Sequence, residues 1–187
     1  AGLMGASLDA ISGSGDTYTV TASTTSGDGT LSVDFNATAS GGATDQAGNV
    51  SVANFTAGDE YTIDRTEPDS VIVFPGAPGS FNATGWTDEI TGTASDTGGA
   101  DVARVDVSIQ LDSTGNFFNG SSFSSPTEVL LQASGTTTWM FALLDSNLAD
   151  GESYTVNAVT TDTAGNVEST PGTAVFTFDT TSPTVAS

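Results

Sequence analysis

Two segments of this chain repeat each other at a fixed spacing, and that repetition limits the fold more than any other feature of the sequence. Residues 61–68 read Tyr-Thr-Ile-Asp-Arg-Thr-Glu-Pro and residues 176–183 read Phe-Thr-Phe-Asp-Thr-Thr-Ser-Pro, so that their aspartates lie 115 residues apart. A second motif, Asp-x-Ala-Gly-Asn, begins at Asp45 and again 117 residues later at Asp162. Because both motifs keep the same order and nearly the same period, the sequence predicts tandem domains.

The complete copy is predicted to span residues 67–179 and to consist of short strands separated by turns. In its clearest segment, Val105, Val107, Ile109 and Leu111 alternate with polar residues, a period of two that is typical of a strand with one buried face. No segment has a convincing helical period, and the abundant Thr, Ser, Val and Gly favour strands and turns. The predicted strands comprise residues 70–74, 88–95, 104–111, 127–132, 137–144, 153–161 and 173–179.

Seven antiparallel strands without a helix predict an all-β fold, namely a Greek-key, immunoglobulin-like β-sandwich. Tyr154 begins a strand just after the turn at Asp150 and Gly151, which resembles the tyrosine corner of sandwich domains. Pro75 and Pro78 are expected to break the first strand at a sheet edge, where prolines are tolerated.

The bulky aromatic residues are expected to fill the core of this sandwich, because a small domain needs their apolar surface. Trp86, Trp139 and the adjacent Phe117 and Phe118 are the main candidates. An alternative is that Trp86 or the Phe117–Phe118 pair forms an exposed platform for sugars.

Residues 1–66 are interpreted as the C-terminal part of an earlier copy, because they contain counterparts of only the later strands. Those counterparts are residues 8–12, 17–23, 30–35, the turn at Asp45, and residues 61–64. Residues 180–187 are predicted to be a linker and the start of a next copy. A half sandwich leaves open strand edges, so we expect a segment outside this chain to complete it, either upstream sequence or a neighbouring molecule. A closed seven-stranded sandwich formed by residues 1–66 alone would contradict this.

The composition excludes several classes of function. The chain has no Cys and no His, so it offers no disulfide, no thiol nucleophile, no His-bearing zinc site and no Ser-His-Asp triad. Its 23 acidic residues face only Arg65 and Arg104, a net charge of −21 that disfavours nucleic acid and anionic membranes as partners. No apolar run is long enough for membrane insertion. Asp88 and Glu89 point to opposite faces of a strand and make no catalytic pair, so we expect no enzyme.

The second copy also resembles a known family, the bacterial immunoglobulin-like (Big-type) tandem repeats of large secreted surface adhesins. This resemblance implies an immunoglobulin-like fold, an extender or stalk role at the extracellular cell surface, and calcium where consecutive domains meet. The motifs that carry it are Ile-Thr-Gly-Thr-Ala-Ser-Asp at 90–96, Phe-Asn-Gly-Ser-Ser-Phe at 118–123, Trp139, Asp-Gly at 150–151, Tyr-Thr-Val at 154–156, Asp-Thr-Ala-Gly-Asn at 162–166, and Phe-Asp-Thr-Thr-Ser-Pro at 178–183.

Sandwich topology leads to calcium independently. The incoming linker and the loops after the second and sixth strands lie at the same end of such a fold, which brings residues 64–69, 96–101 and 162–166 together. Ca²⁺ takes six to eight oxygen ligands, and carboxylates without a cation repel one another. A single aspartate in a Gly-rich turn often only bonds its own backbone, but three converging segments favour calcium. The candidate ligands are Asp64, Thr66, Glu67, Asp96, Asp101 and Asp162.

The function expected from these patterns is a structural extender or stalk segment of a secreted adhesin or extracellular fibre, stiffened by calcium at domain junctions. Its expected partners are neighbouring repeats of the same chain or neighbouring subunits. Two alternatives stay open: a carbohydrate- or protein-binding module whose ligand is a polysaccharide or a surface protein, and an accessory domain of a secreted hydrolase.

Overall fold

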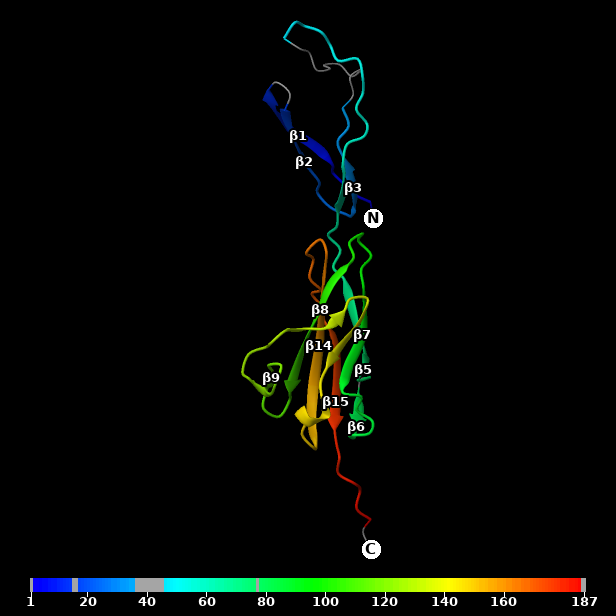
Figure 1. The fold of residues 1–187 in the computed structure, drawn as a ribbon, viewed down its shortest axis with the longest axis vertical. Helices are drawn as coiled ribbons and strands as arrows, with labels where there is room; N and C mark the ends of the chain where they lie inside the picture. The colour runs from blue at the N-terminus through cyan, green and yellow to red at the C-terminus, as the bar shows by residue number, and fades with distance from the viewer. Residues whose placement is uncertain (1, 15–16, 36–45, 77, 186–187) are drawn as a thin grey trace. The chain divides into compact units, whose positions relative to one another are not determined.

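A computed structural model of the chain describes residues 2–14, 17–35, 46–76 and 78–185. It divides into two compact units, Ala1–Arg65 and Thr66–Ser187, called here the first and second units (Figure 1). The described residues form β-strands and one short 3₁₀ helix, η1 (Asp145–Asn147), with no α-helix among them. None of the described residues belongs to a helix that is long and apolar enough to cross a membrane. The predicted all-β class is confirmed.

Two β-sheets make up the second unit, one ordered β10-β9-β8-β14-β15-β6 with β11 also paired to β8, and the other ordered β12-β13-β7-β5. Successive strands such as β7 and β8, or β13 and β14, lie in different sheets, which is the immunoglobulin-like Greek-key arrangement. The strands are β5 (Asp69–Phe74), β6 (Gly79–Phe81), β7 (Glu89–Ser95), β8 (Val102–Leu111), β9 (Asn116–Phe118), β10 (Phe123–Ser125), β11 (Leu131–Gln132), β12 (Ser134–Gly135), β13 (Thr138–Ala142), β14 (Glu152–Asp162) and β15 (Gly172–Phe178).

All seven strands predicted for this copy are present in the predicted order, but the fourth is shorter than expected and four further strands, β6, β9, β10 and β12, were not predicted. Residues 127–132 were expected to be strand, but only Leu131–Gln132 form one, β11. Pro126 lacks an N–H for a sheet ladder. Glu128 instead accepts a hydrogen bond from the Ser108 hydroxyl at 2.6 Å. The predicted break is confirmed, since β5 lies at the edge of its sheet and ends at Phe74. The chain then crosses to the other sheet and forms β6, which pairs in parallel with β15.

The predicted aromatic core is confirmed for Trp86, Phe118 and Trp139, whereas Phe117 is only half-buried and lies outside the core cluster. Trp86, Phe118 and Trp139 are buried, and Trp86 stacks on Phe176 with ring centroids 4.5 Å apart. Gly92 lies opposite Trp139 in the β7–β13 ladder, where a Cβ would overlap the indole ring. Because Trp86 and Phe118 lie inside the sandwich, neither forms an exposed sugar platform.

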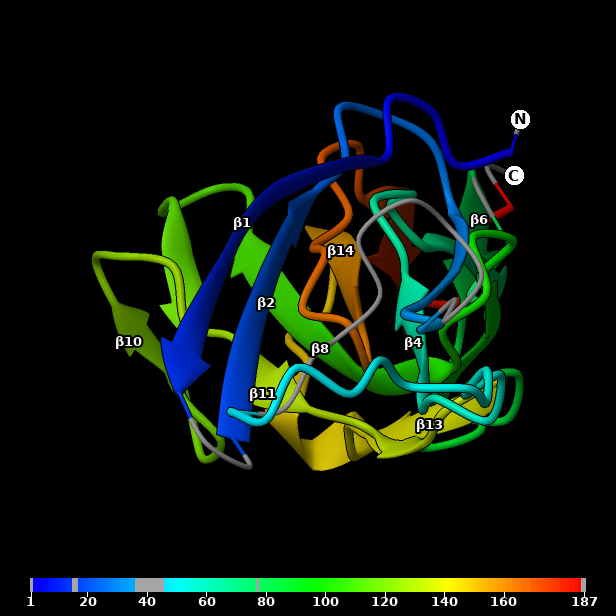
Figure 2. The same cartoon turned by 90° about the horizontal axis from the view of Figure 1, so that it is seen from above.

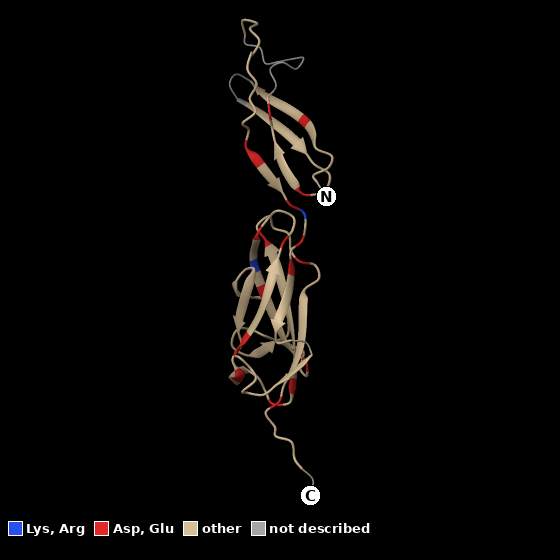
Figure 3. Cartoon of the chain, turned by 90° about the vertical axis from the view of Figure 1, so that its right-hand side faces the viewer, with Lys and Arg blue, Asp and Glu red and all other residues tan. Residues whose placement is uncertain are grey.

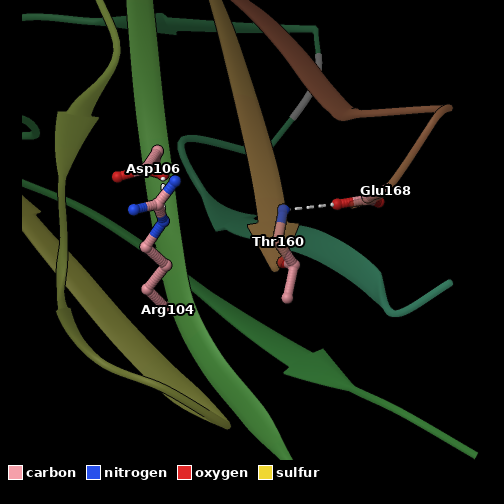
Figure 4. A network of polar contacts seen from close by, with 4 residues as sticks. All are labelled: Arg104, Asp106, Thr160 and Glu168. Atoms are coloured by element: carbon pink, nitrogen blue, oxygen red, sulfur yellow. Dashed lines mark hydrogen bonds and ion pairs between the residues drawn. The ribbon is translucent and has the colours of Figure 1, made fainter. Parts of the chain in front are cut away.

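One face of β8 was expected to be polar and solvated, and this is wrong for Asp106 and Ser108, which are buried. Ser108 is covered by the chain around Glu128, and Asp106 forms an ion pair with Arg104, Nε to Oδ2, at 2.9 Å (Figure 4). The apolar face of the strand is buried as predicted.

The tyrosine corner is also confirmed. The Tyr154 side chain is fully buried, and its phenolic oxygen accepts a hydrogen bond from the Ala149 backbone N–H at 2.7 Å. Burial raises the pKa of Tyr154 although the bond from Ala149 acts to lower it, so the phenol stays neutral at physiological pH.

Replacing Tyr154 with phenylalanine is expected to lower the free energy of unfolding by about 1–3 kcal/mol, because the Ala149 N–H loses its acceptor. Urea unfolding followed by circular dichroism, which reports the strands of both units, measures the loss. Tyr18→Phe is the matched control, since Tyr18 is exposed, and should stay within about 0.5 kcal/mol of the parent. If the two substitutions had equal effects, the hydrogen bond between Ala149 and Tyr154 would not stabilise the fold.

A buried carboxylate joins the two sheets of the second unit. Glu168 is only 6% exposed. It accepts hydrogen bonds from the Ser70 N–H at 2.9 Å and the Ser70 hydroxyl at 2.7 Å. It also accepts one from the Thr160 N–H at 3.0 Å (Figure 4). Ser70 lies on β5 and Thr160 on β14, which belong to different sheets, so this one side chain ties the sheets together.

The first unit contains two separate antiparallel pairs, β1 (Ser7–Ser14) with β2 (Thr17–Ser23), and β3 (Gly29–Ser32) with β4 (Glu60–Ile63) (Figures 1 and 2). None of its described residues is buried. An apolar groove of about 380 Å³ runs between the two pairs and is lined by Leu8, Val20 and Leu31 among others. Asp45 lies outside the described residues. The described part forms no closed sandwich, and completion by a further segment stays a prediction.

Candidate metal centre

Three of the aspartates predicted to bind calcium come together. Asp64, Asp96 and Asp162 each offer one carboxylate oxygen, and these three oxygens lie within 4.8 Å of one another. Asp64 directly follows β4, Asp96 directly follows β7, and Asp162 is the last residue of β14. Acidic residues are found in both units, and several mark the end of the sandwich where the chain enters the second unit (Figure 3).

The turn after β14 aims the Asp162 carboxylate. Its Oδ1 accepts hydrogen bonds from the N–H groups of Gly165 at 2.6 Å and Asn166 at 2.8 Å, while Oδ2 accepts one from the Asn166 amide at 2.7 Å. Gly165 has φ +97°, a conformation that favours glycine. Burial alone would raise the pKa of Asp162, but the bonds from Asn166, Gly165 and Ala164 outweigh burial and lower it. The carboxylate is therefore ionised at neutral pH although only 2% exposed.

The loop after β7 holds the second carboxylate by one oxygen only. Asp96 Oδ1 accepts hydrogen bonds from the N–H groups of Thr97 at 2.7 Å and Gly98 at 3.3 Å. Asp96 Oδ2 is buried and has no hydrogen-bond partner among the described residues. A buried carboxylate oxygen without a partner costs free energy, and a cation is one group that would satisfy it.

The other three candidate ligands are placed differently. Glu67 accepts a hydrogen bond from the Ser169 N–H at 2.9 Å, and its bonds with Ser169 lower the pKa of its carboxyl. The Asp101 backbone exchanges hydrogen bonds with Thr163, at 2.8 and 3.3 Å, which fastens the loop after β7 to the turn after β14. Neither the Glu67 nor the Asp101 carboxylate belongs to the group of three. Thr66 follows Arg65 and is half-buried.

Thr163 is the contributor that sequence reasoning missed. Its backbone and side chain bond the loop residue Asp101, but its only sequence signal is a place in the Asp-x-Ala-Gly-Asn motif, where the first copy has Gln46. Because this position of the motif differs between the two copies, nothing in the sequence indicated that Thr163 contacts the loop after β7.

The donor set identifies the kind of ion that the group could hold. All three side chains offer carboxylate oxygens, and the chain has no His or Cys. Oxygen donors suit hard cations, and Ca²⁺ accepts flexible sets of six to eight of them. Six to eight oxygen ligands could come from the three carboxylates together with backbone carbonyls, the Thr66 hydroxyl and water. The Asp96 Oδ2 atom, buried and without a hydrogen-bond partner among the described residues, is an acceptor that a cation could satisfy.

Comparisons with known proteins add little to this geometry. No protein-family profile and no curated protein matches the chain. A solved structure described as CopC from Methylosinus trichosporium OB3b matches with 23% identity and a TM-score of 0.39, covering 59% of this chain and 93% of that one. A likeness at that level carries no argument about ligand or function. The class defined here, an immunoglobulin-like β-sandwich, rests on the strand order of the second unit.

Proposed function

We propose that this chain is a structural segment of an extracellular tandem array, an extender or stalk in a cell-surface adhesin or fibre, and that bound calcium stiffens it. The repeated motifs that end each copy support a serial arrangement of domains. The acidic surface and the absence of Cys and His from the sequence suit a non-catalytic role in a calcium-containing medium.

The observation that carries the calcium proposal is the buried, unpartnered Oδ2 of Asp96 in a group with Asp64 and Asp162. A solvated turn aspartate would have no reason to bury an oxygen without a partner beside two further carboxylates. Calcium would neutralise the mutual repulsion of the three charges and supply the missing interaction. Because Asp64 lies on the residues that connect the copies, the ion would tie the connecting segment to the sandwich.

Calcium titration of the full chain by isothermal calorimetry tests this proposal. The parent is expected to bind saturably, and Asp162→Asn to weaken binding by at least about tenfold, because affinity depends on the ligand charge. Asp112→Asn is the matched control with the same change of charge. Asp162 pairs with Val102 at the start of β8, and Asp112 comes directly after the last residue of β8. The two aspartates therefore lie about 30 Å apart along the strand. Equal weakening by both variants, or no saturable binding by the parent, would remove the site.

A further inference from the structure

In each unit, the aspartate of an Asp-Gly pair accepts hydrogen bonds from the second residue beyond the last strand. In the first unit, Asp28 Oδ1 accepts a hydrogen bond from the Arg65 backbone N–H at 2.7 Å. Arg65 directly follows Asp64, one of the three clustered carboxylates. The Arg65 guanidinium adds bonds to the same loop, donating to the Gly27 carbonyl at 2.7 Å and to the Thr24 hydroxyl at 2.5 Å.

The second unit repeats the arrangement. Asp150 Oδ1 accepts hydrogen bonds from the Thr180 N–H at 2.5 Å and the Thr180 hydroxyl at 2.8 Å, and Oδ2 accepts one from the Thr181 hydroxyl at 2.7 Å. Thr180 directly follows Asp179, as Arg65 follows Asp64. The bonds from Thr181 and Thr180 lower the pKa of Asp150, so its acceptor oxygens stay charged at neutral pH.

The two Asp-Gly pairs occupy corresponding places in their units. Asp28 and Gly29 lead into β3, which pairs with the last strand of its unit, β4. Asp150 and Gly151 lead into β14, which pairs with the last strand of the second unit, β15. In both units the aspartate thus lies at the end of the final strand pair and bonds the second residue of the outgoing segment. The bonded residues Arg65 and Thr180 lie 180 − 65 = 115 residues apart, the spacing of the repeated motifs, while the two aspartates lie 150 − 28 = 122 apart. The same contact at corresponding places in both units indicates that it belongs to the repeat and not to one loop.

We propose that Asp28 is a positioning residue for the calcium site, and that Asp150 is its equivalent for Asp179. This inference rests on the proposed function. The bond from Arg65 N–H to Asp28 fixes the backbone next to Asp64, so the Asp64 carboxylate is held in place before an ion arrives. Groups that orient a ligand from outside the coordination shell raise metal affinity because less conformational freedom is lost on binding.

The test compares Asp28→Ala and Asp28→Asn in the full chain, each titrated with calcium. Alanine removes the acceptor, so its dissociation constant should rise by about tenfold, the lower end of effects seen for orienting groups around metals. Asparagine keeps an acceptor oxygen and should stay within about threefold of the parent by the same reasoning. Asp9→Asn controls for charge, because Asp9 bonds only to Ser7 and Ser23 in the described contacts.

Amide hydrogen exchange of Arg65 supplies a readout that does not depend on calcium. Exchange at Arg65 should quicken in Asp28→Ala and not in Asp28→Asn, while the amides of β1 and β2 report whether the unit still folds. A parent that binds calcium while Asp28→Ala binds equally well overturns the inference alone. Equal weakening by alanine and asparagine also overturns it, because charge and not the hydrogen bond would then matter. A parent that binds no calcium overturns the proposed function and this inference together.

Discussion

Replacing Glu168 with alanine is expected to lower the free energy of unfolding of the second unit by at least about 3 kcal/mol, since each buried polar group left without a partner costs about 1–3 kcal/mol. The substitution strands three donors, the N–H and hydroxyl of Ser70 and the N–H of Thr160. It also removes the side chain that connects β5 to β14, so the two sheets lose a link at that edge.

Urea unfolding followed by the fluorescence of the buried Trp86 and Trp139 measures this loss. Glu128→Ala is the matched control, because Glu128 is exposed and accepts a single hydrogen bond, from Ser108; it should cost about 1 kcal/mol. Glu168→Gln should also be strongly destabilising, because its amide would place a donor against donors. If Glu168→Ala cost no more than Glu128→Ala, the buried carboxylate would not hold the sheets together.

Calcium is expected to raise the melting temperature of the chain well above its value in sodium at equal ionic strength. An unfolded chain cannot gather Asp64, Asp96 and Asp162 from three distant segments, so the ion binds only the folded state. By mass action the gain is about 2.7 kcal/mol when free calcium is a hundredfold above the dissociation constant. Chelation should reverse the shift, and small-angle scattering should then report a more flexible pair of units.

The sodium arm separates a site from general screening, because monovalent salt at matched ionic strength screens surface repulsion about as well. Asp96→Asn and Asp162→Asn should each shrink the calcium-minus-sodium difference, whereas Asp112→Asn should leave it intact. The difference is the quantity to compare, since Asp162→Asn also disturbs the turn bonds to Asn166. If the melting curves in calcium and in sodium coincided, there would be no calcium site, and the acidic residues would only keep the surface solvated.

Periodicity and repetition predicted most of the second unit. Alternating apolar residues located β8, and the turn before Tyr154 located the tyrosine corner, because both patterns are local and follow from backbone geometry. The convergence of Asp64, Asp96 and Asp162 was also predictable, since sandwich topology alone decides which loops share an end.

What the sequence could not predict depends on contacts between distant segments. Glu168 is one of 23 acidic residues, and no local signal distinguishes a buried carboxylate from a solvated one. The burial of Ser108 depends on a loop that crosses the outer face of β8, which a period of two cannot reveal. β6 could not be predicted, because the prolines before it indicate where the first strand breaks but not which sheet the chain joins next.

The parallel pairing of β6 with β15 has a mechanical consequence. Phe176, Thr177 and Phe178 pair with Gly79, Ser80 and Phe81, so β6, which follows the first strand β5, and the last strand β15 run side by side in the same direction. Tension applied through the incoming and outgoing chain pulls these two strands in opposite senses along their length. Their evenly spaced hydrogen bonds are then strained together in shear and do not open one at a time like a zipper. A domain joined in this way resists stretching along the chain axis, which is the direction in which a tethered stalk is pulled.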